Sequence, residues 1–193
     1  TRHVQTYAGP IEIYGDKLML CIVHDITEQK RLEEQLEHAA HHDAMTGLLN
    51  RRQFYHITEP GQMQHLAIAQ DYSLLLIDTD RFKHINDLYG HSKGDEVLCA
   101  LESCARKGDL VFRWGGEEFV LLLPRTPLDT ALSLAETIRV SVAKVSISGL
   151  PRFTVSIGVA HHEGNESIDE LFKRVDDALY RAKNDGRNRV LAA

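Results

Sequence analysis

The stretch that most constrains this chain lies between two apolar runs, Leu110 to Phe112 and Phe119 to Leu123. Runs of this length are typical of strands, and the pair Gly115-Gly116 between them predicts a tight hairpin. The pair Glu117-Glu118 follows at a place where folding alone does not require charge. Glycine lets a backbone approach a ligand closely, and carboxylates beside it suit a divalent cation held against phosphates. Taken alone, the motif fits both a metal site and a solvated polar tip.

Composition limits the remaining alternatives. The chain has 193 residues, of which 43% are hydrophobic and 26% charged, as expected for a globular protein with one good core and a small extra element. A net charge of −6 argues against a partner that is a nucleic-acid polymer, but leaves room for a small basic nucleotide pocket.

No targeting or membrane segment is expected in this chain. The longest apolar run, Leu18 to Val23, is too short to span a bilayer, and residues 1–10 lack the apolar region of a signal peptide. The three cysteines form no CxxC pair, which favours free thiols in a reducing cytoplasm (Cys21, Cys99 and Cys104). We therefore expect a cytoplasmic location, although a longer parent protein could be anchored upstream.

Residues 1–27 alternate in the manner of strands. Three short strands are expected, with turns at Gly9-Pro10 and Gly15-Asp16. Three strands without a second layer cannot form a core of their own. This zone therefore looks like the end of a domain whose beginning is missing.

Residues 28–41 are expected to form a helix, with Thr27 as its N-cap. The segment contains no glycine or proline, and its apolar residues recur every three to four positions in a narrow stripe (Leu32, Leu36, Ala39 and Ala40). Such a stripe suits a two-stranded coiled coil better than the broad apolar face of a globular helix.

Residues 42–193 read as an α+β domain. Strands and helices alternate around the central hairpin, which fits a ferredoxin-like core with a mainly antiparallel sheet flanked by helices. The expected elements are a helix following Asn50, a strand over 72–77, a helix from Phe82 that breaks at Gly90 and resumes over 95–105, the hairpin, a helix over 128–145, a strand over 153–160 and a helix over 168–184.

A pair of carboxylates follows the first buried strand of this domain. Asp78 and Asp80 share a face if the strand continues, because side chains at i and i+2 point alike. A carboxylate at a strand end beside the glutamates of the hairpin makes a phosphate site with two metal ions conceivable. The alternative is that Asp78 only caps the helix that begins near Phe82.

Further polar residues lie close to that strand end in the sequence. Lys83 could meet phosphate charge, and an amide with a carboxylate, Asn86 and Asp95, could read the hydrogen-bonding edge of guanine. Near the C-terminus, Lys183 and Arg187 are one helical turn apart, on either side of Gly186, and form a second candidate for phosphate binding. A solvated basic helix end is the competing interpretation.

Taken together, these motifs resemble the GGDEF-domain diguanylate cyclases, which condense two GTP into cyclic di-GMP. The match runs in order through His42-Asp43, Thr46-Gly47-Leu48, Asn50-Arg51-Arg52, Asp78, Phe82-Lys83, Asn86-Asp87, Gly90-His91, Gly94-Asp95, Gly115 to Phe119, Ser156-Ile157-Gly158, Tyr180, Ala182-Lys183 and Gly186-Arg187-Asn188. The resemblance implies the palm-like core of nucleotidyl cyclases.

The resemblance also implies site residues. Magnesium, with manganese as an alternative, would be bound by Asp78, the Thr79 carbonyl, Glu117 and Glu118. Glu117 would also serve as the base for the 3′-hydroxyl. The residues that would contact GTP are Phe82, Lys83, Asn86, His91, Asp95, Gly115, Gly116, Lys183 and Arg187, with Lys83 stabilising the transferring phosphoryl group.

A homodimer follows from the implied reaction, because each domain holds one GTP and the reaction joins two. The helix over 28–41 would set the distance and rotation of the two domains. Residues 1–27 end in a way that is similar to the exit of a PAS sensory domain into a signalling helix, so the chain looks like part of a longer sensor.

A site for product inhibition is also expected. Arg106 and Asp109 stand at the offset of the RxxD site, where family members bind cyclic di-GMP. Thr137 stands where a second arginine often completes that site, with Arg139 nearby, which puts tight inhibition in doubt. The segment between Asp95 and Arg106 is also shorter than usual by about one helical turn.

Two other functions compete with the cyclase. One is a catalytically silent GGDEF module that binds GTP or cyclic di-GMP, or acts as a dimer scaffold. The intact residues Asp78, Glu117, Lys83 and Asp95 argue against it. The other is a general nucleoside triphosphatase, which the absence of a GxxxxGK[ST] loop disfavours.

Overall fold

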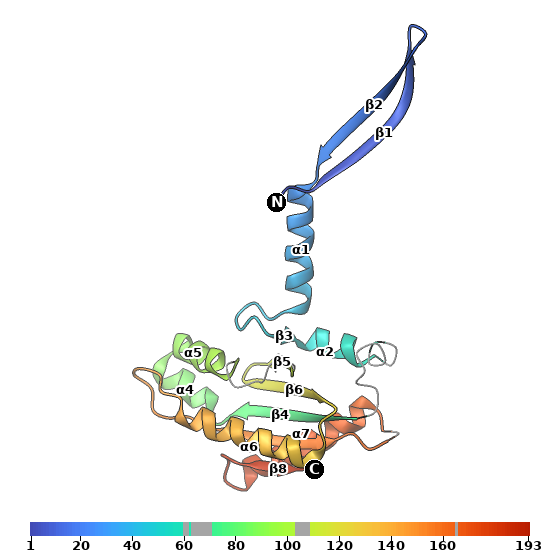
Figure 1. The fold of residues 1–193 in the computed structure, drawn as a ribbon. Coiled ribbons are helices and arrows are strands. Elements are labelled where there is room, and N and C mark those ends of the chain that lie inside the picture. Colours follow the sequence, from blue (N-terminus) through green and yellow to red (C-terminus); the bar gives the residue numbers. More distant parts are fainter. Residues whose placement is uncertain (60–61, 63–70, 103–108, 165) are drawn as a thin grey trace. The chain divides into compact units, whose positions relative to one another are not determined.

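The structure is a computed structural model that describes residues 1–59, 62, 71–102, 109–164 and 166–193. It divides into two units, residues 1–40 and residues 41–193 (Figure 1). None of the helices in the described residues has the length and apolar composition to cross a bilayer.

The first unit begins with one long hairpin. Strand β1 (Val4–Ile13) pairs with β2 (Asp16–Asp25), and the two turn residues both have positive φ, 51° at Tyr14 and 89° at Gly15. The expected break at Gly9-Pro10 is wrong, because β1 continues through it with Pro10 opposite Met19. Proline is tolerated there because a two-stranded hairpin consists only of edge strands.

Helix α1 (Thr27–His41) follows, and none of its residues is buried. The expected N-cap at Thr27 is wrong, because the helix already includes this residue. The Thr27 hydroxyl instead accepts a hydrogen bond from the His3 amide at 2.9 Å, and the Asp25 carboxylate accepts one from the Thr27 amide at 3.0 Å. Leu32 and Leu36 are 46% and 70% exposed, so these two leucines of the apolar stripe are not buried by the described residues.

The second unit is built on a six-stranded sheet in the order β3-β5-β6-β4-β7-β8. The inner strands pair antiparallel and the two outermost pairs are parallel, which confirms the predicted α+β fold with a mainly antiparallel sheet. The strands are β3 (Leu49–Asn50), β4 (Tyr72–Thr79), β5 (Leu110–Gly115), β6 (Glu118–Pro124), β7 (Val155–His161) and β8 (Val190–Ala192).

Helices cover both faces of this sheet (Figure 1). They are α2 (Arg51–Thr58), α4 (Phe82–Tyr89), α5 (His91–Glu102), α6 (Leu128–Lys144) and α7 (Ile168–Asn184). Alternate residues of β4 enter two separate core clusters: Leu75 packs with residues of α4, α5 and α6, while Leu74 packs with residues of α2 and α7. Two buried faces explain why the strand is a continuous apolar run.

Most predicted elements of this unit are present, with three differences. Helix α5 begins at His91, directly after Gly90, and not at Asp95. The short strands β3 and β8 were not predicted. Helix α7 has the predicted bounds, because Ser167 and Glu170 form a capping box that fixes its start.

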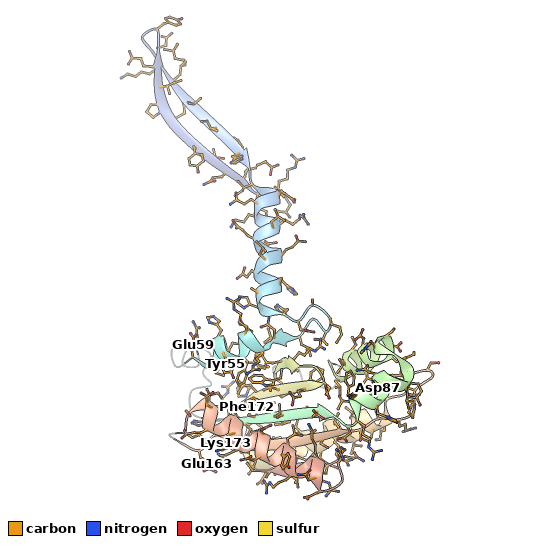
Figure 2. All side chains as sticks on the ribbon, turned by 180° about the vertical axis from the view of Figure 1, so that it is seen from behind. Tyr55, Glu59, Asp87, Glu163, Phe172 and Lys173 are labelled. Carbon is orange, nitrogen blue, oxygen red and sulfur yellow. The ribbon has the colours of Figure 1, made fainter. Side chains whose placement is uncertain are left out.

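An aromatic cluster packs beside the hairpin on the α2 and α7 side of the sheet. The ring of Trp114 stacks on Phe172 at 4.4 Å and meets Phe54 edge-on at 5.2 Å, and the Arg51 guanidinium lies 4.5 Å from its centroid. Figure 2 labels Phe172 on α7 and Tyr55 on α2, which is 5.6 Å from Trp114. The cluster anchors the residue that immediately precedes the two glycines.

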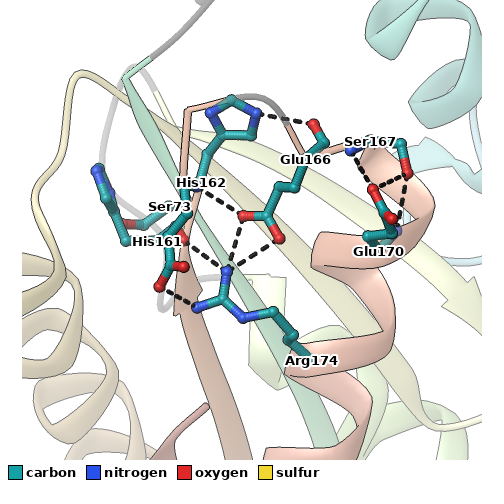
Figure 3. Close-up of polar contacts among 8 residues, drawn as sticks. Ser73, His161, His162, Glu166, Ser167, Glu170 and Arg174 are labelled. Atoms are coloured by element: carbon teal, nitrogen blue, oxygen red, sulfur yellow. Dashed lines mark hydrogen bonds and ion pairs between the residues drawn. The ribbon is translucent and has the colours of Figure 1, made fainter.

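A polar network fastens the far end of β7 to α7 (Figure 3). The guanidinium of Arg174 donates to both carboxylate oxygens of Glu166, at 2.8 and 3.0 Å, to the His161 carbonyl and to Glu163. Tyr72 stacks on His162 at 4.7 Å beside this network, and burial raises the pKa of Tyr72 to about 12. The network fixes the register of α7 on the sheet.

Candidate active site

The candidate site is centred on Asp78, near the end of β4. Strand pairing places Asp78 opposite Glu118 of β6 on one side and Ser156 of β7 on the other. Asp78 is only 6% exposed, and the Lys183 ammonium lies 2.7 Å from its Oδ2. The N-cap of α4 is Arg81, without a side-chain capping bond, so the alternative interpretation of Asp78 as a helix cap is wrong.

The electrostatics of the site favour a cation. Burial raises the pKa of Asp78 to about 6; Lys183 opposes this shift, while Glu117 and Glu118 reinforce it. Burial also raises the pKa of Glu118, which Lys183 counteracts. Asp78 and Glu118 therefore share the Lys183 ammonium in partly desolvated surroundings, with the charge of Glu117 close by, and a further cation would stabilise their ionised forms.

The predicted metal ligands fit a divalent metal by donor type and charge. Asp78, Glu117, Glu118 and the Thr79 carbonyl offer only oxygen, the donor that Mg²⁺ prefers. Among the described residues, no three acidic, histidine or cysteine side chains are already converged as a metal site. Asp78 is held by Lys183 instead, so metal binding would require this ion pair to rearrange.

The predicted guanine residues come from the adjacent helices α4 and α5. Asn86 presents a buried Oδ1 that has no hydrogen-bond partner in the described part of the chain. It lies against Gly94, where a Cβ would stand 2.0 Å from that oxygen. Asp95, the next residue, is exposed, as is His91 at the start of the same helix. A buried acceptor without a partner beside an exposed carboxylate suits a ligand with several N–H donors.

The predicted phosphate residues are arranged differently from the expectation. Lys83 is exposed on the first turn of α4, but the Phe82 side chain is 8% exposed and belongs to the core, so only its backbone could contact a substrate. Lys183 and Arg187 do not share a helical turn. Helix α7 ends at Asn184, and Arg187 lies beyond the C-cap with φ of 65°.

Asp80 has a structural role that the sequence did not reveal. Strand β4 ends at Thr79, and the Asp80 carboxylate is 7% exposed. It accepts hydrogen bonds from the hydroxyls of Thr154 and Ser156, both at 2.6 Å, and from the Asn188 amide at 3.0 Å. Asp80 therefore joins the end of β4, the start of β7 and the segment after α7.

Arg113 supports the hairpin turn, and this role was also missed. Its Nε and Nη2 donate to the Gly116 carbonyl at 3.3 and 3.0 Å, and its Nη1 contacts Asp43 Oδ1 at 2.9 Å. The same Asp43 oxygen accepts from the amide and the hydroxyl of Thr46. The sequence offered one signal for this role, an arginine two residues before the first glycine of the turn.

The predicted product site is only partly described. Arg106 lies outside the described residues, and Asp109 is half-buried just before β5. On α6, the Thr137 hydroxyl donates to the Ser133 carbonyl at 2.8 Å. Arg139 contacts both Glu136 and Asn188, so its guanidinium is already engaged.

Comparison with known proteins agrees with this geometry. Residues 40–189 match the family described as diguanylate cyclase, GGDEF domain. The Escherichia coli K12 protein named diguanylate cyclase DgcM is 98% identical over 197 aligned positions, which cover 100% of this chain and 48% of that protein. The chain thus spans about half the length of the curated relatives it matches first. The alignment has 197 positions, whereas this chain has 193 residues. The alignment therefore contains gap positions at which DgcM has residues and this chain has none.

Two solved structures share the fold. The coiled coil and GGDEF domain of DgcB from Caulobacter crescentus, in complex with c-di-GMP, has a TM-score of 0.76 and 32% identity, covering 86% of this chain and 94% of that one. The active GGEEF domain of a Vibrio cholerae diguanylate cyclase has a TM-score of 0.68 and 38% identity, covering 75% of this chain and 97% of that one. The strand-end aspartate, the two-glutamate hairpin and these matches lead to one conclusion: the chain belongs to the GGDEF-domain family of diguanylate cyclases.

Proposed function

We propose that this chain condenses two GTP into cyclic di-GMP and releases two pyrophosphates. The observation that carries the proposal is the pairing of Asp78 with Glu118 across β4 and β6, next to an intact Gly-Gly-Glu-Glu turn and the Lys183 ammonium. Similar proteins support it, because DgcM and the Vibrio cholerae protein are both named diguanylate cyclases.

Each group of residues has a task in this proposal. Asp78, Glu117, Glu118 and the Thr79 carbonyl would hold Mg²⁺ or Mn²⁺, which would polarise the α-phosphate and offset its charge. The partnerless Oδ1 of Asn86 and the carboxylate of Asp95 accept from the N1–H and 2-amino groups of guanine, with His91 nearby. Gly115 and Gly116 leave space for the nucleotide backbone.

The chemical step depends mainly on positioning and electrostatics. Glu117 accepts the proton of the 3′-hydroxyl as that oxygen attacks the α-phosphorus of the other GTP in line with the departing pyrophosphate. Lys83 stabilises negative charge on the transferring group, while Lys183 and Arg187 hold the triphosphate. Arg113 keeps the turn in place through the Gly116 carbonyl.

The reaction requires two copies of the domain facing each other, so we propose a homodimer. Residues 28–41 would form the signalling coiled coil, and residues 1–27 would be the last strands of a PAS sensory domain in a cytoplasmic sensor. Cyclic di-GMP is the product, and Arg106 with Asp109 would form its inhibitory site. DgcB from Caulobacter crescentus, crystallised with c-di-GMP, supports binding of this compound within the family.

The test is incubation of the chain with GTP and Mg²⁺, followed by chromatographic separation of cyclic di-GMP and pyrophosphate. We expect both products, and loss of turnover by a factor of about 10³ or more in Glu117→Gln, which removes a metal ligand and the base. Glu59→Gln, an exposed glutamate at the end of α2, is the matched control and should keep full activity. A dimeric sample that binds GTP without forming product would instead identify the chain as a silent GGDEF receptor.

A further inference from the structure

One arginine of helix α6 reaches a segment that lies 49 positions later in the chain. The Nη1 of Arg139 donates to the Asn188 side-chain oxygen at 2.6 Å. Its Nε and Nη2 donate to the two carboxylate oxygens of Glu136, three residues earlier on the same helix. This paired contact fixes the plane of the guanidinium and directs the remaining nitrogen toward Asn188. Arg139 has no task in the reaction as proposed above.

Asn188 is held from two sides. Its side-chain oxygen accepts from α6, while its backbone amide donates to the Asp80 carboxylate beside the end of β4 at 3.0 Å. The next residue is held as well, because the Arg189 carbonyl accepts from the Ile157 amide of β7 at 2.9 Å. Among the described residues, Arg139 is the only hydrogen-bond partner of the Asn188 side chain. Removal of Arg139 would therefore release this side chain while the backbone contacts remain.

The backbone of this segment is in a conformation that needs support. Arg187 and Asn188 have φ of 65° and 47°, so two consecutive residues with a Cβ lie in the left-handed region. Such residues visit this region singly and at a steric cost, and they persist there only where surrounding contacts hold them. The hydrogen bond from Arg139 is one of these contacts. It therefore helps to determine the direction in which the Arg187 side chain leaves the backbone.

We propose that Arg139 is a positioning residue for nucleotide binding: through Asn188, it holds the backbone from which Arg187 extends. This role rests on the proposed function, in which Arg187 holds the triphosphate. The competing interpretation is that Arg139 and Glu136 form a surface ion pair that only stabilises α6, and such pairs contribute little. The side chain of Arg139 is only 19% exposed, and its third contact reaches outside the helix, which favours the positioning role.

Isothermal titration of the full chain with 3′-deoxy-GTP and with GMP, both in the presence of Mg²⁺, tests the proposal. The first ligand lacks the attacking hydroxyl and so reports binding without turnover, and the second lacks the terminal phosphates. Arg139→Met should weaken binding of 3′-deoxy-GTP by about tenfold, because a displaced Arg187 loses a charge-assisted hydrogen bond to phosphate. Binding of GMP should not change. A general loosening of the domain would instead weaken the binding of both ligands equally.

A double-mutant cycle shows whether Arg139 acts through Asn188. Asn188→Gly removes the acceptor without steric cost at positive φ, and should weaken 3′-deoxy-GTP binding by a similar factor. The variant with both substitutions should bind no more weakly than either single variant. Lys144→Met is the matched control, because it removes an exposed cation from the same helix and should bind both ligands normally. Thermal unfolding checks that each variant folds, and Asn188→Gly tests the same contact if Arg139→Met does not fold.

The outcomes separate this role from the proposed function. The positioning role is overturned if Arg139→Met or Asn188→Gly binds 3′-deoxy-GTP normally, if GMP binding weakens equally, or if the two single losses add up in the double variant. An unmodified chain that does not bind 3′-deoxy-GTP would refute both proposals. A chain that shows the expected losses but forms no cyclic di-GMP from GTP would refute the cyclase and leave the positioning role standing, in a silent nucleotide receptor.

Discussion

At the scale of single residues, Asp78 is the most informative position. It lies near the end of a fully buried strand. Burial and two neighbouring glutamates raise its pKa, while the Lys183 ammonium lowers it. The sequence allowed Asp78 to be placed at a strand end, because four apolar residues precede it. It could not show that Lys183, 105 positions later, forms an ion pair with Asp78, since nothing in the sequence specifies such a contact.

The charge state of Asp78 gives a pH-dependent stability. The pKa of about 6 in the folded chain exceeds the ordinary value of 3.8, so the folded state holds this proton more tightly than the unfolded state. Without metal, stability should therefore fall as the pH rises from about 4 to about 6, by roughly 2 to 3 kcal/mol for two pKa units. The measurement is urea unfolding in EDTA across this range, with Asp78→Asn as reference.

The difference in unfolding free energy between the unmodified chain and Asp78→Asn isolates Asp78 together with its coupling to Glu117 and Glu118, because carboxylates distant from Asp78 titrate alike in both proteins. We expect the difference to shrink with rising pH in EDTA and to recover when Mg²⁺ is added. Parallel stability curves for the two proteins would show that Asp78 titrates at its ordinary value.

At the scale of elements, two glycines determine how closely helices pack. A Cβ on Gly158 of β7 would lie 2.2 Å from the Val175 carbonyl oxygen and 2.6 Å from the Leu179 amide nitrogen, both in the backbone of α7. A Cβ on Gly94 of α5 would instead meet the side chain of Asn86. The first contact cannot relax without moving a helix, whereas the second involves only side chains, those of Asn86 and of Phe82, whose ring would lie 3.0 Å from the added Cβ.

Alanine at these two positions should therefore have different effects. Gly158→Ala should destabilise the second unit at the upper end of the roughly 1 to 3 kcal/mol typical of overpacking. Gly94→Ala should cost less stability but weaken GTP binding, because Asn86 is displaced. Urea unfolding and GTP titration of both variants measure this. The assignment fails if Gly94→Ala binds GTP normally, or if Gly158→Ala is as stable as the unmodified chain.

The hairpin depends on Arg113, which joins the Gly116 carbonyl to Asp43. Arg113→Met should reduce GTP turnover by about tenfold to a hundredfold, because small displacements of catalytic groups are costly. It should also reduce stability by about 1 to 3 kcal/mol, because Asp43 loses a charged partner. Steady-state kinetics and urea unfolding test both effects, with Arg125→Met as the exposed control. Turnover equal to that of the control would exclude a positioning role.

The long elements could be predicted from the sequence. The short strands, and the contacts that join distant elements, could not. Helix α7 could be placed from Ile168 to Asn184, where Ser167 and Glu170 form a capping box at its start, and the hairpin could be placed because glycines separate two apolar runs. Strands β3 and β8 have two and three residues, too few for a periodic pattern. Arg187 was misplaced because its spacing of four residues from Lys183 was taken as one helical turn, although the helix predicted over 168–184 ends before Arg187.

At the scale of the whole molecule, the proposed chemistry requires association of two chains. The exposed Leu32 and Leu36 of α1 are the predicted contact, since neither is buried by the described residues. The double variant Leu32→Glu/Leu36→Glu should reduce dimerisation and make the specific activity depend more steeply on protein concentration. Lys30→Glu changes the net charge by the same amount outside the stripe of leucines and alanines, and is the control.

Sedimentation velocity and cyclic di-GMP formation, measured over the same concentrations, check this prediction. In the leucine variant, the dimer fraction should fall and the specific activity should depend more steeply on protein concentration. In Lys30→Glu, neither quantity should change. A leucine variant that remains dimeric and fully active would show that α1 does not contribute the contact.

The buried carboxylate of Asp80 has a consequence for how the protein folds. Its partners Thr154, Ser156 and Asn188 lie 74, 76 and 108 positions away along the chain. Contacts between such distant segments require closure of long loops, so they form only when most of the chain has already collapsed. The residues on both sides of this junction, Asp78 and Arg187, belong to the proposed nucleotide site. Nucleotide binding should therefore appear only at the last stage of folding, which makes it a stricter measure of native structure than helix content.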